Sequence, residues 1–152
     1  MRAYRLVKTR YVAAVLAGDG ASFRHGARWN SPGDRAVYAA ENRALAVIES
    51  LAHVPRLVGL PPHTMVQLEI PKELIERPID APAASDAAAA VAFGSKWFRE
   101  QRSVALVVPS VIVPEEANII INAAHPDAGK VAVVAQVDYP LDDRLKVLLG
   151  RR

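Results

Sequence analysis

Apolar residues recur along the chain in short runs that predict strands. Met65, Gln67 and Glu69 alternate with apolar neighbours, which predicts a half-buried strand ending before Pro71. Val104–Val108 is a continuous apolar run, which is typical of a strand buried on both faces. The same reasoning predicts short strands at residues 2–7, 35–40, 65–70, 103–109, 111–113, 119–121 and 131–137.

Two segments instead show helical spacing. The first covers residues 41–53, and Glu49 borders its apolar stripe. That stripe consists of Ala44, Leu45, Ile48, Leu51 and Ala52. The second runs from a cap at Ser85 or Asp86 to about residue 101. Several short strands, two helices and no regular alternation predict an α+β fold of mostly antiparallel strands with peripheral helices.

Residues 18–33 predict a long loop with four of the eight glycines in the chain. Long loops inside compact domains are uncommon and often functional. This loop carries side chains that bind anions, stack on rings and form hydrogen bonds, namely Arg24, His25, Arg28, Trp29 and Asn30. A simple connection would not need this mixture, so we expect the loop to contribute to a binding site.

Length and charge limit the possibilities further. The 152 residues fit one domain spanning residues 1–152. Net charge is +3, and residues 1–35 hold seven cations against two acids. This local excess suits an anionic ligand such as a phosphate ester, a nucleic-acid surface, or a solvated face. No apolar run is long enough to span a membrane, and Arg10 abuts the short run 11–17, which argues against a signal peptide.

The sequence lacks the residues or motifs that several classes of chemistry require. The chain has no cysteine, which excludes thiol catalysis, disulfides and cysteine-ligated zinc and suits a reducing cytoplasm. Its four histidines have no metal-ligand spacing, so no metal site is expected. Neither a G-x-S-x-G elbow nor a phosphate-binding or dinucleotide-binding glycine motif occurs.

An ordered series of short motifs carries a stronger signal. It comprises Gly26–Gly33, Val37–Glu41, Ala44–Glu49, Gly94–Trp97, Val108–Ser110, Glu116–Asn118, Asn122–Pro126 and Asp143–Leu145. In order and spacing it resembles the RES-domain family, the toxins of bacterial type II toxin–antitoxin systems whose partner is an Xre-type antitoxin. The arginine, glutamate and serine that name the family match Arg28, Glu49 and Ser110.

The resemblance implies a fold similar to the ADP-ribosyltransferases and an enzyme that consumes NAD+. NAD+ would be a substrate, so no cofactor is expected. The implied reaction cleaves the bond between nicotinamide and ribose by hydrolysis or phosphorolysis. The implied partner is a cognate Xre-type antitoxin in the cytoplasm, without direct nucleic-acid or membrane contact, and homo-oligomerisation is left open.

Elementary chemistry agrees with these implications. Nicotinamide in NAD+ is already a cationic leaving group, so cleavage needs an anion near the ribose and donors for the diphosphate. We assign Glu49 to the ribose 2′-hydroxyl and Arg28 to phosphate. Tyr38 would stack on nicotinamide, and Ser110 would orient the nicotinamide amide or the ribose. The wider binding set adds Trp29, Asn30, Asn118 and Asn122.

Each assignment has a structural alternative. Glu49 could pair with Arg43 or Arg56, Trp29 could be a packing residue, and the asparagines could satisfy loop backbone. Three functional alternatives also stay open: transfer of ADP-ribose to a protein, a nucleic-acid-binding module, and a scaffold that only binds the antitoxin.

Overall fold

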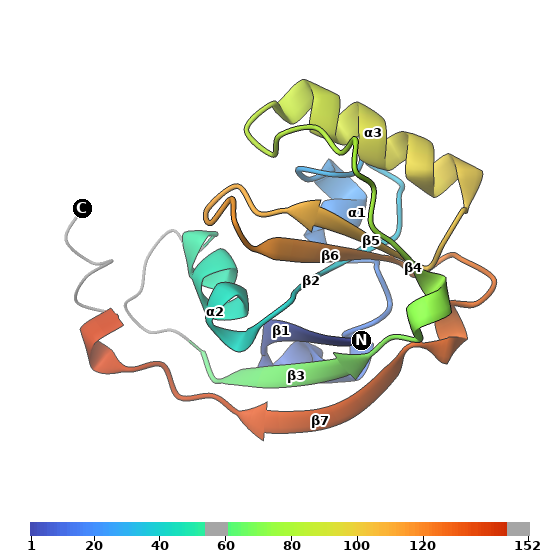
Figure 1. Cartoon of the computed structure of the whole chain (residues 1–152). Helices are drawn as coiled ribbons and strands as arrows, with labels where there is room; N and C mark the ends of the chain where they lie inside the picture. The colour runs from blue at the N-terminus through green and yellow to red at the C-terminus, as the bar shows by residue number, and fades with distance from the viewer. Residues whose placement is uncertain (54–60, 146–152) are drawn as a thin grey trace.

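The computed structural model describes residues 1–53 and 61–145, which form a mixed structure of strands and helices (Figure 1). One sheet has the strand order β4-β5-β6-β2-β1-β3-β7, and all its pairs are antiparallel except β4–β5. The strands are β1 (Arg2–Lys8), β2 (Ala36–Ala40), β3 (His63–Glu69), β4 (Ile75–Glu76), β5 (Ala105–Pro109), β6 (Ala117–Asn122) and β7 (Ala132–Asp138). The α-helices are α1 (Ala21–His25), α2 (Arg43–Ala52) and α3 (Ala87–Glu100). Short 3-10 helices cover Thr9–Ala14, Lys72–Leu74 and Ala128–Lys130.

The sheet divides at its centre. Strands β1 and β3 pair along their whole length, whereas β1 and β2 share the single register pair Tyr4↔Ala40. Beyond that pair the two strands separate, so the sheet consists of two halves, β4-β5-β6-β2 and β1-β3-β7 (Figure 1). The inner faces of both halves supply one buried core. Its members include Ala3, Val7, Val37, Val66, Leu68, Val107, Ile119 and Ile121.

The other face of the sheet is covered by two helices. Helix α3 packs over β5 and β6 through a cluster that includes Trp97, Phe98, Leu106 and Ile120. Helix α2 packs over the β1–β3 side through a separate cluster that includes Leu6, Leu45, Leu51 and Met65. Figure 1 shows the two helices at different ends of the molecule. The α+β prediction, with mostly antiparallel strands and peripheral helices, is therefore confirmed.

Side-chain caps explain where both long helices begin. The Asp86 carboxylate accepts a hydrogen bond from the Ala89 N–H at 3.0 Å, as the sequence predicts for α3. In α2 the Asn42 side chain accepts from the Leu45 N–H at 2.8 Å. The helix consequently begins at Arg43, two residues later than its apolar pattern indicates.

The predicted apolar stripe of α2 is partly wrong. Leu45 and Leu51 are buried, but Ala44, Ile48 and Ala52 are exposed. Ala46 and Val47 are buried in their place. The buried surface of α2 is therefore shifted toward Ala46 and Val47, in the cluster against which Val113 and Tyr139 also pack.

Two strand predictions also need correction. Residues 111–113 form a turn, because the Ser110 hydroxyl accepts hydrogen bonds from the N–H groups of Ile112 and Val113. Strand β3 is buried on both faces over its first half: Val66 enters the inner core, while Met65 packs under α2. Gln67 is half-buried and Glu69 is exposed, so the predicted half-buried character holds only for the end of the strand.

A short helix interrupts the long loop predicted at residues 18–33. Helix α1 covers Ala21–His25 and ends at Gly26, which has a positive φ of 74°. A tight turn follows, closed by backbone hydrogen bonds between Ala27 and Asn30. Arg28 and Trp29 are the two central residues of this turn. No helix in the described part of the chain is long and apolar enough to cross a membrane.

Candidate active site

The separation of β1 and β2 opens a groove of about 1180 Å³. Its lining includes side chains from both strands on both faces of the sheet, so the groove runs along the gap between the half-sheets. The lining also includes Glu49 of α2, His53 just after that helix, and Asn118 of β6. The turn that carries Arg28 also borders it. The topology thus brings together residues that are far apart in the sequence.

The Glu49 carboxylate is held by two side-chain donors. The Ser110 hydroxyl donates to Glu49 Oε1 at 2.7 Å, and the Asn118 amide donates to the same oxygen at 2.6 Å. Both bonds are charge-assisted, which makes them stronger than neutral ones. No hydrogen bond from the described residues engages Oε2. The second oxygen is therefore available to a ligand in the groove.

Ser110 and Asn118 are brought to Glu49 by the pairing of β5 with β6. Val108 is opposite Asn118 in that ladder, and Ser110 follows the last residue of β5. The Ser110 side chain is 1% exposed and is fixed by the N–H groups of Ile112 and Val113. It lies behind the carboxylate and outside the groove lining, so its contact is with Glu49.

Tyr38 connects the groove to the Arg28 turn. Its hydroxyl donates to the Asn30 side chain at 2.8 Å and accepts from the Trp29 N–H at 3.0 Å. Burial raises the pKa of Tyr38, with a further contribution from Asp34, so the phenol stays neutral. Its hydroxyl is occupied by these bonds, while its ring contributes to the groove wall. The ring is thus the part of Tyr38 that faces a ligand.

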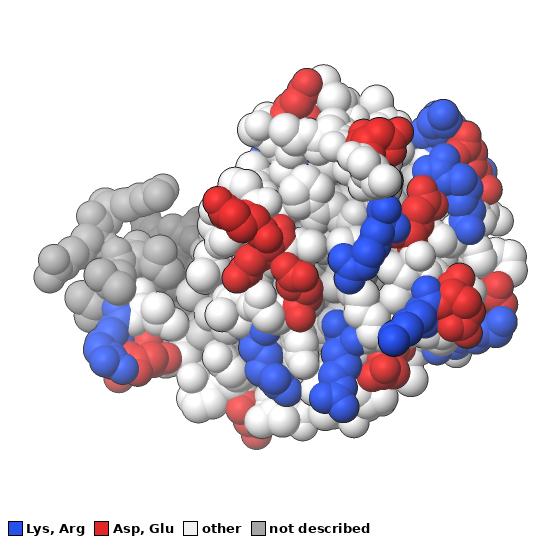
Figure 2. Space-filling model, in the orientation of Figure 1, with Lys and Arg blue, Asp and Glu red and all other residues white. Residues whose placement is uncertain are grey.

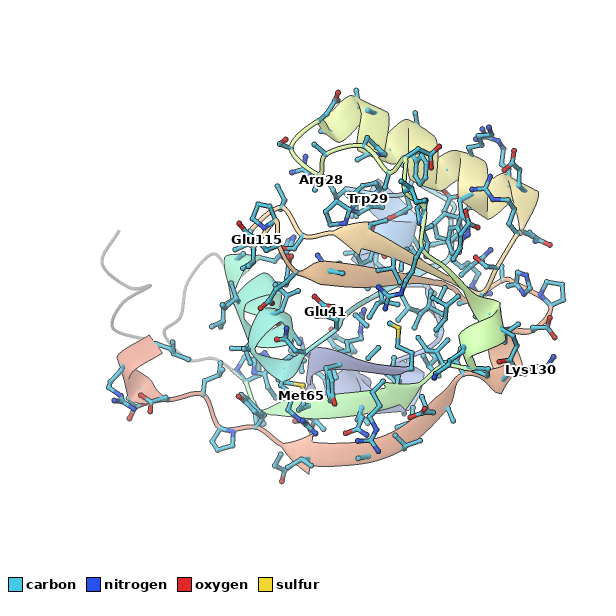
Figure 3. All side chains as sticks on the ribbon, in the orientation of Figure 1. Arg28, Trp29, Glu41, Met65, Glu115 and Lys130 are labelled. Atoms are coloured by element: carbon cyan, nitrogen blue, oxygen red, sulfur yellow. The ribbon has the colours of Figure 1, made fainter. Side chains whose placement is uncertain are left out.

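The side chains of Arg28 and Trp29 lie in different environments. Trp29 is 1% exposed and packs edge-on against Phe93, with ring centroids 6.4 Å apart. The Arg28 side chain is half-buried and borders the groove, and no hydrogen bond or ion pair to another described residue holds its guanidinium. Figure 3 shows both residues beneath α3. Arg28 is therefore a cation free to bind an anion.

Helix α3 holds this turn in place by a close backbone approach. A Cβ atom added at Gly94 would lie 1.8 Å from the Trp29 carbonyl oxygen, so glycine is required there. One helical residue further on, the Ser95 hydroxyl lies 2.8 Å from that of Ser31. The turn is therefore attached to a rigid helix, which fixes the position of Arg28.

Two predicted binding residues do not reach the groove. Asn30 is fully buried and uses its side chain to bind the Ser22 and Ser31 carbonyls and the Tyr38 hydroxyl. Asn122 lies at the other end of β6 from Asn118, where its side chain accepts from the Ala124 N–H. Both side chains satisfy local polar groups, and neither lines the groove.

Sequence reasoning missed one groove residue, Arg5. In the sequence it is one of the early cations and part of the segment where the family resemblance begins; in the structure it lies between Ala3 and Val7 on the inner, core-facing side of β1. Its guanidinium donates to the Tyr38 carbonyl at 2.5 Å. A charged residue at a core position of a strand is the signal that could have drawn attention to it.

The site combines an anchored carboxylate, a free cation and an aromatic wall. Within the part of the chain that the structure describes, no group of three histidine, aspartate or glutamate side chains could hold a metal ion. An anchored carboxylate beside a cation can stabilise positive charge on a bound sugar while an attached phosphate is held. This combination of groups is suited to binding a sugar phosphate or a nucleotide.

Comparisons with known proteins place the chain in a family. Residues 2–142 match the family model of the RES domain. A "Prs ADP-ribosylating toxin" of Sphingobium sp. (strain YBL2) is 44% identical over 128 residues, 78% of each chain. "Toxin Res" of Photorhabdus laumondii is 36% identical over 149 residues, which cover 93% of this chain and 95% of that protein. The chain therefore belongs to the RES domain family of toxins.

A solved structure agrees with the fold. The toxin–antitoxin complex MbcT–MbcA of M. tuberculosis contains a chain that superimposes with a TM-score of 0.69. The match covers 99% of this chain and 89% of that one at 16% sequence identity. At so low an identity the likeness establishes the fold, and the roles of individual residues rest on the geometry described above.

Proposed function

We propose that this protein is an NAD+-degrading toxin of a toxin–antitoxin system. It would cleave the bond between nicotinamide and ribose by hydrolysis or phosphorolysis. The observation that carries the proposal is the Glu49 carboxylate, held through Oε1 by Ser110 and Asn118 beside the groove. Such a carboxylate suits a reaction in which positive charge develops on a sugar ring.

The proposed reaction is balanced without a metal or cofactor. The bond between ribose C1′ and the nicotinamide nitrogen breaks, and its electron pair leaves with nicotinamide, which becomes neutral. The ribose ring gains oxocarbenium character, and Glu49 Oε2 accepts a hydrogen bond from the 2′-hydroxyl. An oxygen of water or phosphate then bonds to C1′. Water loses a proton to solvent, and the product is ADP-ribose or its phosphorylated form.

The other residues would position the substrate. Arg28 offers a planar pair of donors that matches a phosphate group. The Tyr38 ring supplies an apolar surface for nicotinamide. Ser110 and Asn118 orient Glu49, so they would act through the carboxylate. Trp29 would fix the turn by its packing, since its side chain is 1% exposed.

The second candidate function is transfer of ADP-ribose to a protein. The Sphingobium relative is named an ADP-ribosylating toxin, which favours this alternative. The same bond breaks in both reactions, and only the acceptor at C1′ differs. The reaction products therefore decide between the two candidates.

A cognate antitoxin of the Xre type is the proposed partner, and the cytoplasm is the proposed location. The structural neighbour is a toxin–antitoxin complex. Beside the anchored carboxylate, Ile48, Val111 and Ile112 expose 43%, 41% and 38% of their surface. An antitoxin that covers these apolar residues would also close the groove. The face in Figure 2 intersperses acidic with basic side chains, which gives no support to a nucleic-acid surface.

The test is NAD+ turnover by purified, antitoxin-free protein, with and without inorganic phosphate, with products identified by mass. Free ADP-ribose in both conditions would establish hydrolysis. A phosphorylated ADP-ribose formed only with phosphate would establish phosphorolysis. NAD+ loss only in the presence of cell extract, with ADP-ribose attached to a protein, would favour the second candidate. Intact NAD+ in every case, with protein shown to be folded, would contradict all three reactions.

A further inference from the structure

The two edges of the sheet differ in length. Strand β4 forms one edge and has only two residues, Ile75 and Glu76, whereas β7 forms the other edge with seven. Figure 1 shows β7 along the outer border of the molecule, beyond β3. No strand of the described chain pairs with its outer side. Since long, exposed edge strands are templates for pairing with another chain, the β7 edge is the part of the sheet that can accept a further strand.

The side chains of β7 lack the charges that usually protect a sheet edge. Natural edge strands commonly carry lysine, proline or another charged residue. Between Ala132 and Asp138 there is no lysine, arginine or proline, and the only charge is the Asp138 carboxylate at the end of the strand. Val134 and Val137 instead expose 50% and 60% of their surface. The edge is therefore both long and largely apolar.

The backbone of residues 135–139 presents unused donors and acceptors on its outer side. The one register shift between β3 and β7 lies before this stretch, which pairs regularly with residues 63–67. Residues of an antiparallel strand direct their N–H and C=O groups alternately toward one side and the other. Because the Tyr139 N–H donates to the His63 carbonyl at 2.9 Å, residues 135, 137 and 139 face β3. The N–H and C=O groups of Gln136 and Asp138 consequently point away from the sheet.

We propose that β7 pairs in antiparallel orientation with β7 of a second copy of this chain, about a two-fold axis through Val137. In this register Gln136 of each copy is opposite Asp138 of the other, so the outward N–H and C=O groups of both residues are paired. Pro140 has no N–H and ends the pairing at both of its ends. This interface goes beyond the proposed reaction and does not depend on it.

The side chains of β7 suit this register. On the face of the sheet that carries α2, Val137 would contact its own copy and Ala135 would be opposite Tyr139. These three residues border a small apolar pocket of about 110 Å³, whose rim the pairing would cover. On the other face the Gln136 amide would donate to the Asp138 carboxylate of the second copy. A register centred on Asp138 would instead place two carboxylates directly opposite each other, which is destabilising.

Pairing through β7 leaves the candidate active site open. No residue of β7 lines the groove, and β3 separates β7 from the point where β1 and β2 diverge. The sheet of each copy would continue into the other at the border shown in Figure 1. Substitutions in β7 should therefore change the oligomeric state and leave NAD+ turnover unchanged. This independence separates a failure of the interface from a failure of the proposed function.

A cysteine on the proposed axis tests the pairing directly, because the chain has no cysteine of its own. Facing residues of a non-hydrogen-bonded antiparallel pair have Cα atoms about 4.5 Å apart, which is within disulfide range. In diamide, Val137→Cys should form a covalent dimer about 10-fold faster or more than Val134→Cys, because pairing raises the effective thiol concentration. Val134 is similarly exposed but lies outside the paired stretch, so it is the matched control. Equal rates on non-reducing gels, or faster crosslinking of Val134→Cys, would overturn the proposal.

Analytical ultracentrifugation measures the dimer without crosslinking. We expect Val137→Lys to convert it to a monomer, because two ammonium groups would meet at the axis. Gln136→Glu should weaken dimerisation about 10-fold by facing Asp138, since like charges then oppose each other in two places. Combining Gln136→Glu with Asp138→Lys should restore it, because opposite charges then face each other. The thermal midpoint of the monomeric Val137→Lys protein, expected near the wild-type value, shows that the fold is intact.

Two results would overturn the proposal. The first is a wild-type protein that sediments as a monomer at every concentration. The second is amide hydrogen exchange at Gln136 and Asp138 that slows only when the antitoxin is added, because the edge would then pair with a strand of the antitoxin. Self-pairing instead predicts exchange at these two amides that slows as the concentration of the toxin alone rises.

Discussion

Helices α2 and α3 lie on the same face of one sheet but differ in what they contribute. Helix α3 buries Trp97 and Phe98, and the Trp97 indole donates to the Ser103 hydroxyl at 2.8 Å inside the core. Helix α2 leaves Ile48 exposed and Glu49 half-buried at the groove. Stability is thus concentrated in one helix, and the polar chemistry is carried by the other.

Because the buried cluster and the charged site lie on different helices, this small domain can hold a charged site without weakening its core. The α3 cluster fixes the Arg28 turn through the contact at Gly94, while the carboxylate is fixed from another direction by β5 and β6. Substitutions in α3 should therefore change folding, and substitutions around Glu49 should change activity. Four experiments test this division of roles between the two helices.

The largest effect is expected from Trp97→Ala. This side chain is fully buried, and truncating a buried aromatic residue costs about 3–5 kcal/mol of unfolding free energy. Chemical denaturation measures the loss. Tyr11→Ala is the surface control, since Tyr11 is 53% exposed, and it should change stability little. A Trp97 variant as stable as wild type would show that α3 is not the stabilising helix.

Glu49→Gln should reduce NAD+ cleavage by about 10²–10³-fold, because the amide lacks the charge that stabilises the ribosyl cation. The thermal midpoint should stay close to that of wild type. Glu115→Gln removes an equivalent charge from an exposed position and should leave turnover unchanged. Wild-type turnover in a folded Glu49 variant would assign the chemistry to another residue.

Ser110→Ala and Asn118→Ala should each lower kcat about tenfold, as expected for removing one hydrogen bond to a charged group. Since both donors bind Oε1, their effects should not be additive, and a double-mutant cycle on kcat measures the coupling. Additive losses would mean that the two donors act on different groups. Val108→Ala in β5 is the neighbouring control for packing.

The smallest effects are expected from substitutions at the two helix caps. Asn42→Ala and Asp86→Ala should each cost about 1 kcal/mol of unfolding free energy. Only Asn42→Ala should also reduce turnover, because the first turn of α2 lies on the helix that carries Glu49. Equal activity in both variants would indicate that frayed ends do not disturb the site.

Local sequence signals predicted much of the fold. The cap at Asp86 and the apolar run of β5 define elements by themselves, and the structure has both. The Val111–Val113 prediction failed because a hydroxyl, Ser110, captures the backbone N–H groups that a strand would need. The order of the strands could not be derived, because it depends on pairings such as β1 with β3 across distant segments.

The site was predictable only as a set of residues brought together by resemblance. Nothing local shows that Asn118 and Ser110 share one oxygen of Glu49, since they lie 69 and 61 residues away from it. Asn30 and Asn122 belong to the same motifs and yet serve the backbone. Tertiary contacts, which motif order does not contain, separate the two kinds of asparagine.

The strands of the sheet are synthesised in an order that differs from their order in the sheet, and this has a further consequence. Strand β2 is made early, but its partner β6 is among the last strands to leave the ribosome, and β6 carries Asn118. Until that strand emerges, β2 has no neighbour on one side, and the Glu49 carboxylate lacks the Asn118 donor and the β5–β6 pairing that positions Ser110. A chain that ends before β6 therefore lacks an oriented carboxylate, and the cell that makes this toxin meets a complete site only after β6 has been made.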